Sequence, residues 1–197
     1  MIKVNKNTFV KWIIVWMTTC GVVVFILFPF ISISSLAYCI IINVLLIIWM
    51  SIVETLLQPE LKSSYFNSHH IERKGKIYEY IGVHFFRKLL VLIGWERSRK
   101  KENPIKESLI LLEYYEYRTR TSEFGHTIIA IIIFIISVYV CIKYSYKNIL
   151  WLVFFNIFLN ICPITIQRYN RPRVRRVIKK LKLKLKLKDS KIVYKNW

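Results

Sequence analysis

The sequence is short of glycine and of the motifs that depend on it. Only five of its 197 residues are glycine, and none belongs to a P-loop, a dinucleotide fingerprint or a nucleophile elbow. None of the four histidines is followed five residues later by aspartate, so the His-x4-Asp pattern of many glycerolipid acyltransferases is missing too. These absences argue against phosphate-cradling and serine-hydrolase mechanisms.

Cysteine is also scarce, and its placement indicates neither metal binding nor disulfides. Each of the four cysteines lies in a different apolar stretch, and none has the spacing of metal ligands. We therefore expect no metal site, no disulfide framework and no cofactor. The cysteines are Cys20, Cys39, Cys141 and Cys162.

Acidic residues are few, whereas apolar and basic residues are abundant. Eleven Asp and Glu against 31 Lys and Arg give a formal net charge of +20. With 55% hydrophobic residues and a mean hydropathy of +0.39, the chain is too apolar for a soluble domain of this length. Charged residues avoid four long windows and gather between them, which is typical of bilayer-spanning helices.

The four apolar windows predict an all-α polytopic membrane protein with about four transmembrane helices in a single membrane domain, residues 1–197. The first two windows have about twenty residues each and should form a helical hairpin; the last two are near the lower length limit. A cleavable signal peptide is the alternative for the first window, but that run is too long for an h-region. The predicted spans are residues 12–31, 36–57, 127–142 and 149–166.

Basic residues predict the orientation of these spans. Three precede the first window, thirteen lie between Lys62 and Arg120, and thirteen follow the last window. The two remaining connections carry none and two. By the positive-inside rule, both termini and the central segment should be cytoplasmic in a multi-pass protein of the cell membrane.

The central segment, residues 58–125, predicts interfacial amphipathic helices rather than a soluble domain. One helix should cover residues 77–95 in the headgroup plane, although a re-entrant helix is the alternative. A second should begin with Asn103 as cap and Pro104 in its first turn. The apolar face of the first helix would consist of Ile81, Phe85, Leu89, Leu92 and Ile93.

The C-terminal tail, residues 168–197, carries thirteen basic residues and one acidic residue, Asp189. Such a tail should bind anionic lipid headgroups, since each basic residue near the surface contributes about 1 kcal/mol. No motif indicates nucleic-acid binding. The tail should begin as a helix, but residues 181–188 alternate Leu with Lys, so helix and strand both stay open there.

Polar residues cluster near the cytoplasmic ends of the last two windows. Glu123 and His126 share a helix face, and Asn156, Asn160 and Gln167 form a stripe at spacings of four and seven. Polar groups in a bilayer are costly unless they are paired or functional. The functional interpretation competes with a structural one, in which amides hold helices together and Glu123 pairs with Arg168 or Arg171.

The stretch from Asn160 to Arg173, NICPITIQRYNRPR, resembles the C-terminal signature of the glycosyl-4,4'-diaponeurosporenoate acyltransferase family, in which an Asn and a Pro precede Gln-Arg-Tyr-Asn-Arg. Two weaker elements agree: residues 72–88 resemble the family's central glycine-containing stretch, and Glu123 to His126 resembles its Glu-x-x-His. After the central stretch, Gly94-Trp-Glu-Arg97 departs from the family's lysine- and proline-rich ending, which bears on the substrate more than on the fold.

The resemblance implies transfer of a fatty acyl chain to a sugar hydroxyl of a glycosylated carotenoid or related glycolipid. The donor would be a thioester. By their chemistry, we interpret His126 as the base and Glu123 as the group that orients it. The alternative is a non-enzymatic scaffold or lipid-binding subunit. Substrate-binding candidates are Asn160, Gln167 and Asn170 as hydrogen-bond donors and Arg168 and Arg171 as anion-binding groups.

Overall fold

The computed structural model describes residues 6–27, 32–33, 35–92, 108–144 and 146–195. These residues are predominantly helical and contain no strand, which confirms the all-α prediction. Contacts divide the chain into two compact units: unit 1 comprises Met1–Leu61 and Glu123–Ile164, and unit 2 comprises Lys62–Ser122 and Thr165–Trp197.

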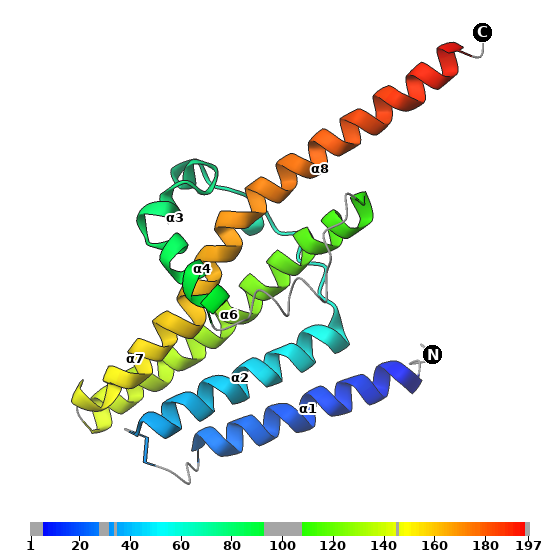
Figure 1. Cartoon of the computed structure of the whole chain (residues 1–197). Helices are drawn as coiled ribbons and strands as arrows, with labels where there is room; N and C mark the ends of the chain where they lie inside the picture. The colour runs from blue at the N-terminus through cyan, green and yellow to red at the C-terminus, as the bar shows by residue number, and fades with distance from the viewer. Residues whose placement is uncertain (1–5, 28–31, 34, 93–107, 145, 196–197) are drawn as a thin grey trace. The chain divides into compact units, whose positions relative to one another are not determined.

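The apolar windows are largely helical, and the last two lie in longer helical runs, residues 109–143 and 150–195 (Figure 1). Short 3-10 segments lie at Ser64–Phe66, His70–Gly75 and Tyr146–Ile149, and a π-helical turn covers Ile157–Ile161. The α-helices are α1 (Lys6–Leu27), α2 (Leu36–Leu57), α3 (Ile77–Tyr80), α4 (Val83–Leu92), α6 (Leu109–Lys143), α7 (Leu150–Asn156) and α8 (Cys162–Lys195).

Three of these helices are long and apolar enough to cross a membrane, by length and composition. They are α2, α6 and the helical run from Leu150 to Leu187. The apolar part of α1, Val10–Ile26, is shorter, and the predicted first span extends into residues 28–31, which are outside the described residues. The second predicted span, residues 36–57, coincides with α2.

In unit 1, α1 and α2 lie side by side as the predicted hairpin (Figure 1). The indole N–H of Trp49 donates to the hydroxyl of Thr19 over 3.0 Å, which satisfies two polar groups inside an apolar pair of helices. Ser35 caps α2 by accepting from the backbone N–H of Tyr38. At the other end Gln58 adopts a left-handed conformation, and Pro59 follows.

The core of unit 1 forms where α2, the second half of α6 and α7 meet. Its side chains recur at helical spacing along α2 and α6, so each helix buries one apolar stripe in this core. The buried core residues are Tyr38, Cys39, Ile42, Leu46, Met50, Ile129, Ile133, Ile136, Val140 and Leu152.

Unit 2 corrects one prediction. The expected single helix over residues 77–95 is broken into α3 and α4, because Gly82 adopts a φ of +87°, which ends a right-handed helix. The described part of this segment buries Val83 and Phe86, whereas the predicted apolar-face residue Phe85 is exposed. Residues 93–95, the predicted cap Asn103 and Pro104 lie outside the described residues.

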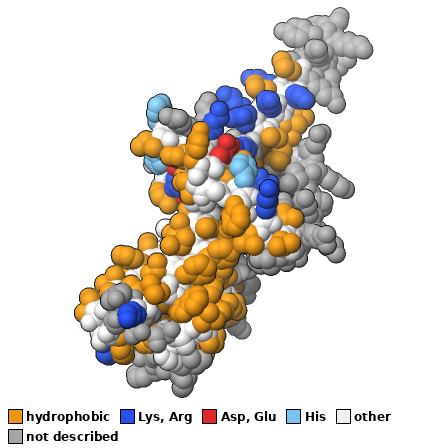
Figure 2. All heavy atoms as spheres, turned by 60° about the vertical axis from the view of Figure 1, so that its left-hand side comes forward, with side chains coloured by type: hydrophobic (Ala, Val, Ile, Leu, Met, Phe, Trp, Pro, Cys, Tyr) orange, Lys and Arg blue, Asp and Glu red, His pale blue; other side chains and the backbone are white. Residues whose placement is uncertain are grey.

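Helix α8 settles the ambiguity in the tail, because it is helical to Lys195. Leu and Lys alternate from Leu181 to Lys188 without forming a strand in the structure. Figure 2 shows Lys and Arg side chains along the described part of α8, and hydrophobic side chains over the visible face of unit 1.

Candidate functional site

The polar groups of unit 1 form a hydrogen-bonded network centred on Asn160, which is fully buried. Its side-chain N–H groups donate to the amide oxygens of Asn43 at 3.0 Å and Asn156 at 3.1 Å. Its own amide oxygen lies 3.3 Å from Nδ1 of His126. The network thus connects three helical segments, α2, α6 and the α7 to π-turn region.

Each amide in this network has a defined orientation. Asn43 donates to the carbonyl oxygen of Cys39 at 2.8 Å, and Asn156 donates to that of Ala130 at 3.1 Å. Both therefore present their oxygens to Asn160, whose oxygen must in turn face His126. A neutral His126 consequently donates from Nδ1–H, and its Nε2 keeps a lone pair.

Two features of the chain place Asn160. It lies in the π-helical turn Ile157–Ile161, directly before α8. Pro163 is the second residue of α8. Proline has no backbone N–H to donate, and in a regular helix its ring collides with the carbonyl four residues earlier, which the wider π turn avoids. Such turns occur frequently at functional sites.

Asn43 is a member of this network that our sequence interpretation missed. It is fully buried in α2. The signal was present, since it is a polar residue in the otherwise apolar run Cys39 to Met50. Nothing in the sequence alone pairs it with a residue that lies 117 positions later.

Glu123, the predicted partner of His126, is fully buried on α6. Two residues later, α6 packs tightly against α2 at Gly125, where an added Cβ would lie 2.3 Å from a carboxylate oxygen of Glu54 and 3.0 Å from Cγ of Met50. Glycine at this position leaves room for the Glu54 carboxylate against the backbone next to His126, and a larger residue would displace that carboxylate.

In unit 2, Arg168 of the Gln-Arg-Tyr-Asn-Arg motif contacts the segment that connects α2 to α3. It forms an ion pair with Glu72 and donates to the carbonyl oxygen of Tyr65 at 3.3 Å. Its guanidinium carbon lies 4.6 Å from the centre of the Tyr65 ring. Nearby, burial raises the pKa of the Tyr78 phenol to about 12, and the Glu72 carboxylate adds to this effect.

Arg171 is buried, with an exposed fraction of 3%. Its guanidinium donates to the hydroxyl and the carbonyl oxygen of Thr119 at 3.0 and 2.9 Å, and to the carbonyl oxygen of Phe66 at 3.2 Å. It therefore joins α8, α6 and the Ser64–Phe66 turn. The structure gives this arginine a clear packing role in addition to the anion-binding role inferred from its charge.

Tyr169 packs against Gly75, which has a φ of +91°. A Cβ on Gly75 would lie 3.2 Å from the backbone oxygen of Tyr169, so this position requires glycine for both conformation and space. The Tyr169 ring also meets His84 edge-on at 5.5 Å.

The two remaining motif amides differ in their contacts. Gln167 donates to the hydroxyl of Ser122 at 3.2 Å. Asn170 is half-buried and has no side-chain hydrogen bond to any described residue. Of the predicted site residues, Glu123, His126 and Asn160 belong to unit 1, while Gln167, Arg168, Asn170 and Arg171 belong to unit 2.

Comparison with models of protein families gives a match. A family model described as glycosyl-4,4'-diaponeurosporenoate acyltransferase matches residues 62–180, more than half of the chain. Searches of curated proteins and of solved structures find no match. The matched region includes all seven predicted site residues.

Proposed function

Because the chain belongs to the glycosyl-4,4'-diaponeurosporenoate acyltransferase family, we propose that it transfers a fatty acyl chain to a hydroxyl of a glycosylated carotenoid or related glycolipid. The donor is a thioester, and the reaction takes place at the membrane. The observation that carries this proposal is the hydrogen bond between His126 and Asn160 inside an apolar unit.

In the proposed reaction, the acceptor hydroxyl oxygen attacks the thioester carbonyl carbon, and the carbon–sulfur bond breaks. Nε2 of His126 takes the hydroxyl proton and returns it to the leaving thiolate. Since Asn160 accepts from Nδ1–H, the reactive nitrogen is the one that carries the lone pair. Glu123, buried one turn earlier, is proposed to favour the imidazolium that forms transiently.

The contacts of the amides refine their proposed roles. Both N–H groups of Asn160 already donate to other amides, so we assign it to positioning His126 rather than to binding an oxyanion. For unit 2 we propose Asn170 and the second N–H of Gln167 as substrate donors. Arg168 and Arg171 are proposed to contribute positive potential for anionic substrate groups while they hold unit 2 together.

We also propose a location in the cell membrane, as a single membrane domain with several spans and with both termini in the cytoplasm. The distribution of basic residues supports this orientation. The basic face of α8 would then meet anionic headgroups of the cytoplasmic leaflet.

Mass spectrometry of membrane lipids and pigments tests the proposed function. The host should make glycosylated carotenoids and express the wild type, His126→Gln, or the control His69→Gln at matched membrane levels. His69 is exposed in unit 2, so its substitution removes a histidine without altering the amide network.

An acylated product with the wild type and His69→Gln, but not with His126→Gln, would support acyl transfer with His126 as base. Identical profiles in all strains, including one without the gene, would favour the scaffold or lipid-binding alternative. Product in all expressing strains would keep the activity but exclude His126 as the base.

A further inference from the structure

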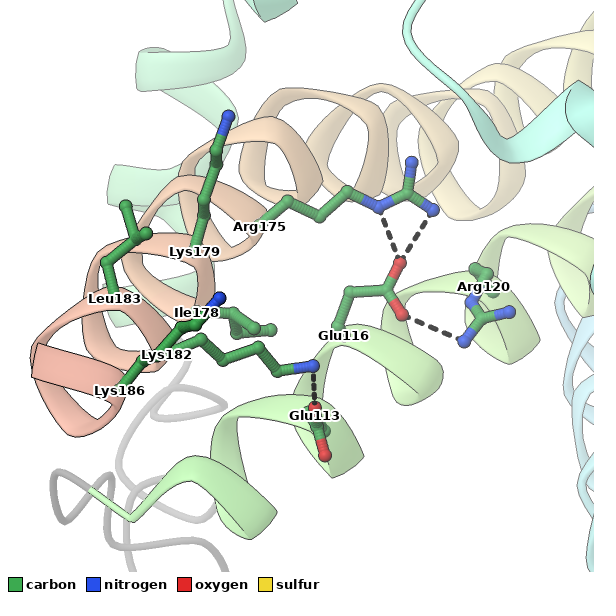
Figure 3. Close-up of a pocket in the computed structure, with 9 residues that line it drawn as sticks. All are labelled: Glu113, Glu116, Arg120, Arg175, Ile178, Lys179, Lys182, Leu183 and Lys186. Carbon is green, nitrogen blue, oxygen red and sulfur yellow. Dashed lines mark hydrogen bonds and ion pairs between the residues drawn. The ribbon is translucent and has the colours of Figure 1, made fainter. Parts of the chain in front are cut away.

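A basic groove lies in unit 2 between the first part of α6 and α8 (Figure 3). It has a volume of about 600 Å³, which is within the usual range for a small-molecule site, about 300–1,000 Å³. The described lining contains five cationic and two acidic side chains, so it is positive by three charges.

Four of the cations form one stripe along α8. Arg175, Lys179, Lys182 and Lys186 are separated by four, three and four residues, so they share the helix face that points into the groove. The stripe spans twelve residues, from Arg175 to Lys186, or about 16 Å of helix. Such a row fits a ligand that carries several negative groups along its length.

Two carboxylates on the α6 side of the groove hold three of the five cations in place. Glu116 accepts from Nε of Arg175 at 2.8 Å and pairs with Arg120 at 2.8 Å. Glu113 pairs with Lys182 at 2.6 Å, but both side chains are about half exposed, so this ion pair is weak and easily displaced.

The two other lysines of the stripe have no such neighbours. Lys179 and Lys186 form no ion pair or hydrogen bond with any residue in the described part of the chain, although both line the groove. Ile178 and Leu183 add apolar surface beside them. The groove thus combines uncompensated positive charge with apolar contact area, which suits a phosphorylated ligand that also carries an aromatic base.

We propose that this groove binds the nucleotide head of a coenzyme A thioester, the acyl donor of the proposed reaction. The inference rests on the proposed function, which requires a thioester donor. The volume of the groove, about 600 Å³, fits a small ligand. A single lipid phosphate would use only part of the cationic stripe.

Binding measured apart from catalysis tests this proposal. The full chain in nanodiscs of neutral phosphatidylcholine is titrated calorimetrically with coenzyme A and with 3'-dephospho-coenzyme A. The test variant is Lys179→Gln with Lys186→Gln. The matched control is Lys180→Gln with Lys184→Gln, which removes the same charge from exposed positions of α8 outside the described groove lining.

Coenzyme A should bind the wild type and the control alike, and about tenfold more weakly to the test variant, as expected for the loss of charge-assisted contacts. Removal of the 3'-phosphate should weaken binding to the wild type. No binding to the wild type, or equal weakening in both double variants, would overturn the proposal.

A second arm separates coenzyme A from lipid headgroups. Nanodiscs containing phosphatidylglycerol should leave coenzyme A binding in place apart from general charge repulsion, which the control variant measures. If phosphatidylglycerol abolishes coenzyme A binding to the wild type but does not lower it in the Lys179→Gln, Lys186→Gln variant, the groove is a headgroup site.

The two proposals can fail separately. Acyl product without coenzyme A binding would overturn the groove assignment alone; coenzyme A binding without product would overturn the proposed function alone.

Discussion

The amide of Asn160 donates to the side-chain oxygen of Asn43 over 3.0 Å, although 117 positions separate them in the sequence. This bond fixes which side of the Asn160 amide faces His126. It links α2, which lies outside the family-matched residues 62–180, to the proposed base. Catalysis in this protein should therefore depend on a residue far from the family motif.

Replacing Asn160 with Ala should lower the acyl-transfer rate by about 100-fold, the lower end of what positioned acid–base groups contribute. The variant loses the acceptor that holds the His126 tautomer. KM for the donor should change little, because Asn160 acts on the base and not on binding. Steady-state kinetics in nanodiscs measures both constants; a rise in KM at unchanged kcat would contradict this role.

Replacing Asn43 with Leu should reduce the rate only when Asn160 is present. In the wild-type background, Asn43→Leu should lower the acyl-transfer rate about tenfold. In the Asn160→Ala background it should lower the rate no further, because the effects of substitutions within one hydrogen-bond network are not additive. Ser137→Ala is the control, since that buried hydroxyl bonds only within its own helix, to Ile133. Additive losses would show that Asn43 acts through stability alone.

Two glycines with positive φ should respond differently to alanine. Gly75 (φ +91°) abuts Tyr169, whereas Gly82 (φ +87°) has open space around it. Gly82→Ala should cost about 1–2 kcal/mol for the left-handed conformation alone. Gly75→Ala should cost more, because the backbone must also move. Thermal unfolding in detergent compares them; equal losses would exclude the packing contribution.

Tyr78 should keep its proton at pH values where an exposed tyrosine loses it. Burial, with the Glu72 carboxylate adding to the effect, raises the pKa of this phenol to about 12. The raised pKa means that the folded state retains the proton longer than the unfolded state. The resulting stability is present below pH 10 and is lost as the pH rises toward 12.

The difference between wild type and Tyr78→Phe in an ultraviolet titration isolates this phenol from the other tyrosines. A component titrating near pH 10 would contradict the buried contact with Glu72. The free energies of unfolding of the wild type and Tyr78→Phe should converge as the pH rises from about 10 toward 12.

Arg171→Lys should destabilise the protein by about 1–3 kcal/mol, because a single ammonium cannot replace the bonds to Thr119 and Phe66 at once. Thermal unfolding measures the loss. If Arg171→Lys is as stable as the wild type but less active, the result would favour direct substrate binding by Arg171 over the packing role.

The helical elements were largely predictable, because hydrophobic length and charge segregation depend on the local sequence. Apolar runs predicted α2 with its bounds, and the Gln-Arg-Tyr-Asn-Arg motif predicted the family. The break at Gly82 was missed because periodicity does not report the sign of φ. The helical end of α8 was left open because alternating Leu and Lys satisfy two periodicities.

The sequence by itself determined that this is an apolar, basic, all-α chain of an acyltransferase family, since composition and motif are properties of consecutive residues. The tertiary structure alone decided that Asn43 completes the Asn160–His126 network, that Arg171 is bonded to Thr119, and that four cations of α8 line a groove with Glu113 and Glu116. Hydrogen bonds and grooves depend on distances between side chains that packing brings together, which no local pattern encodes.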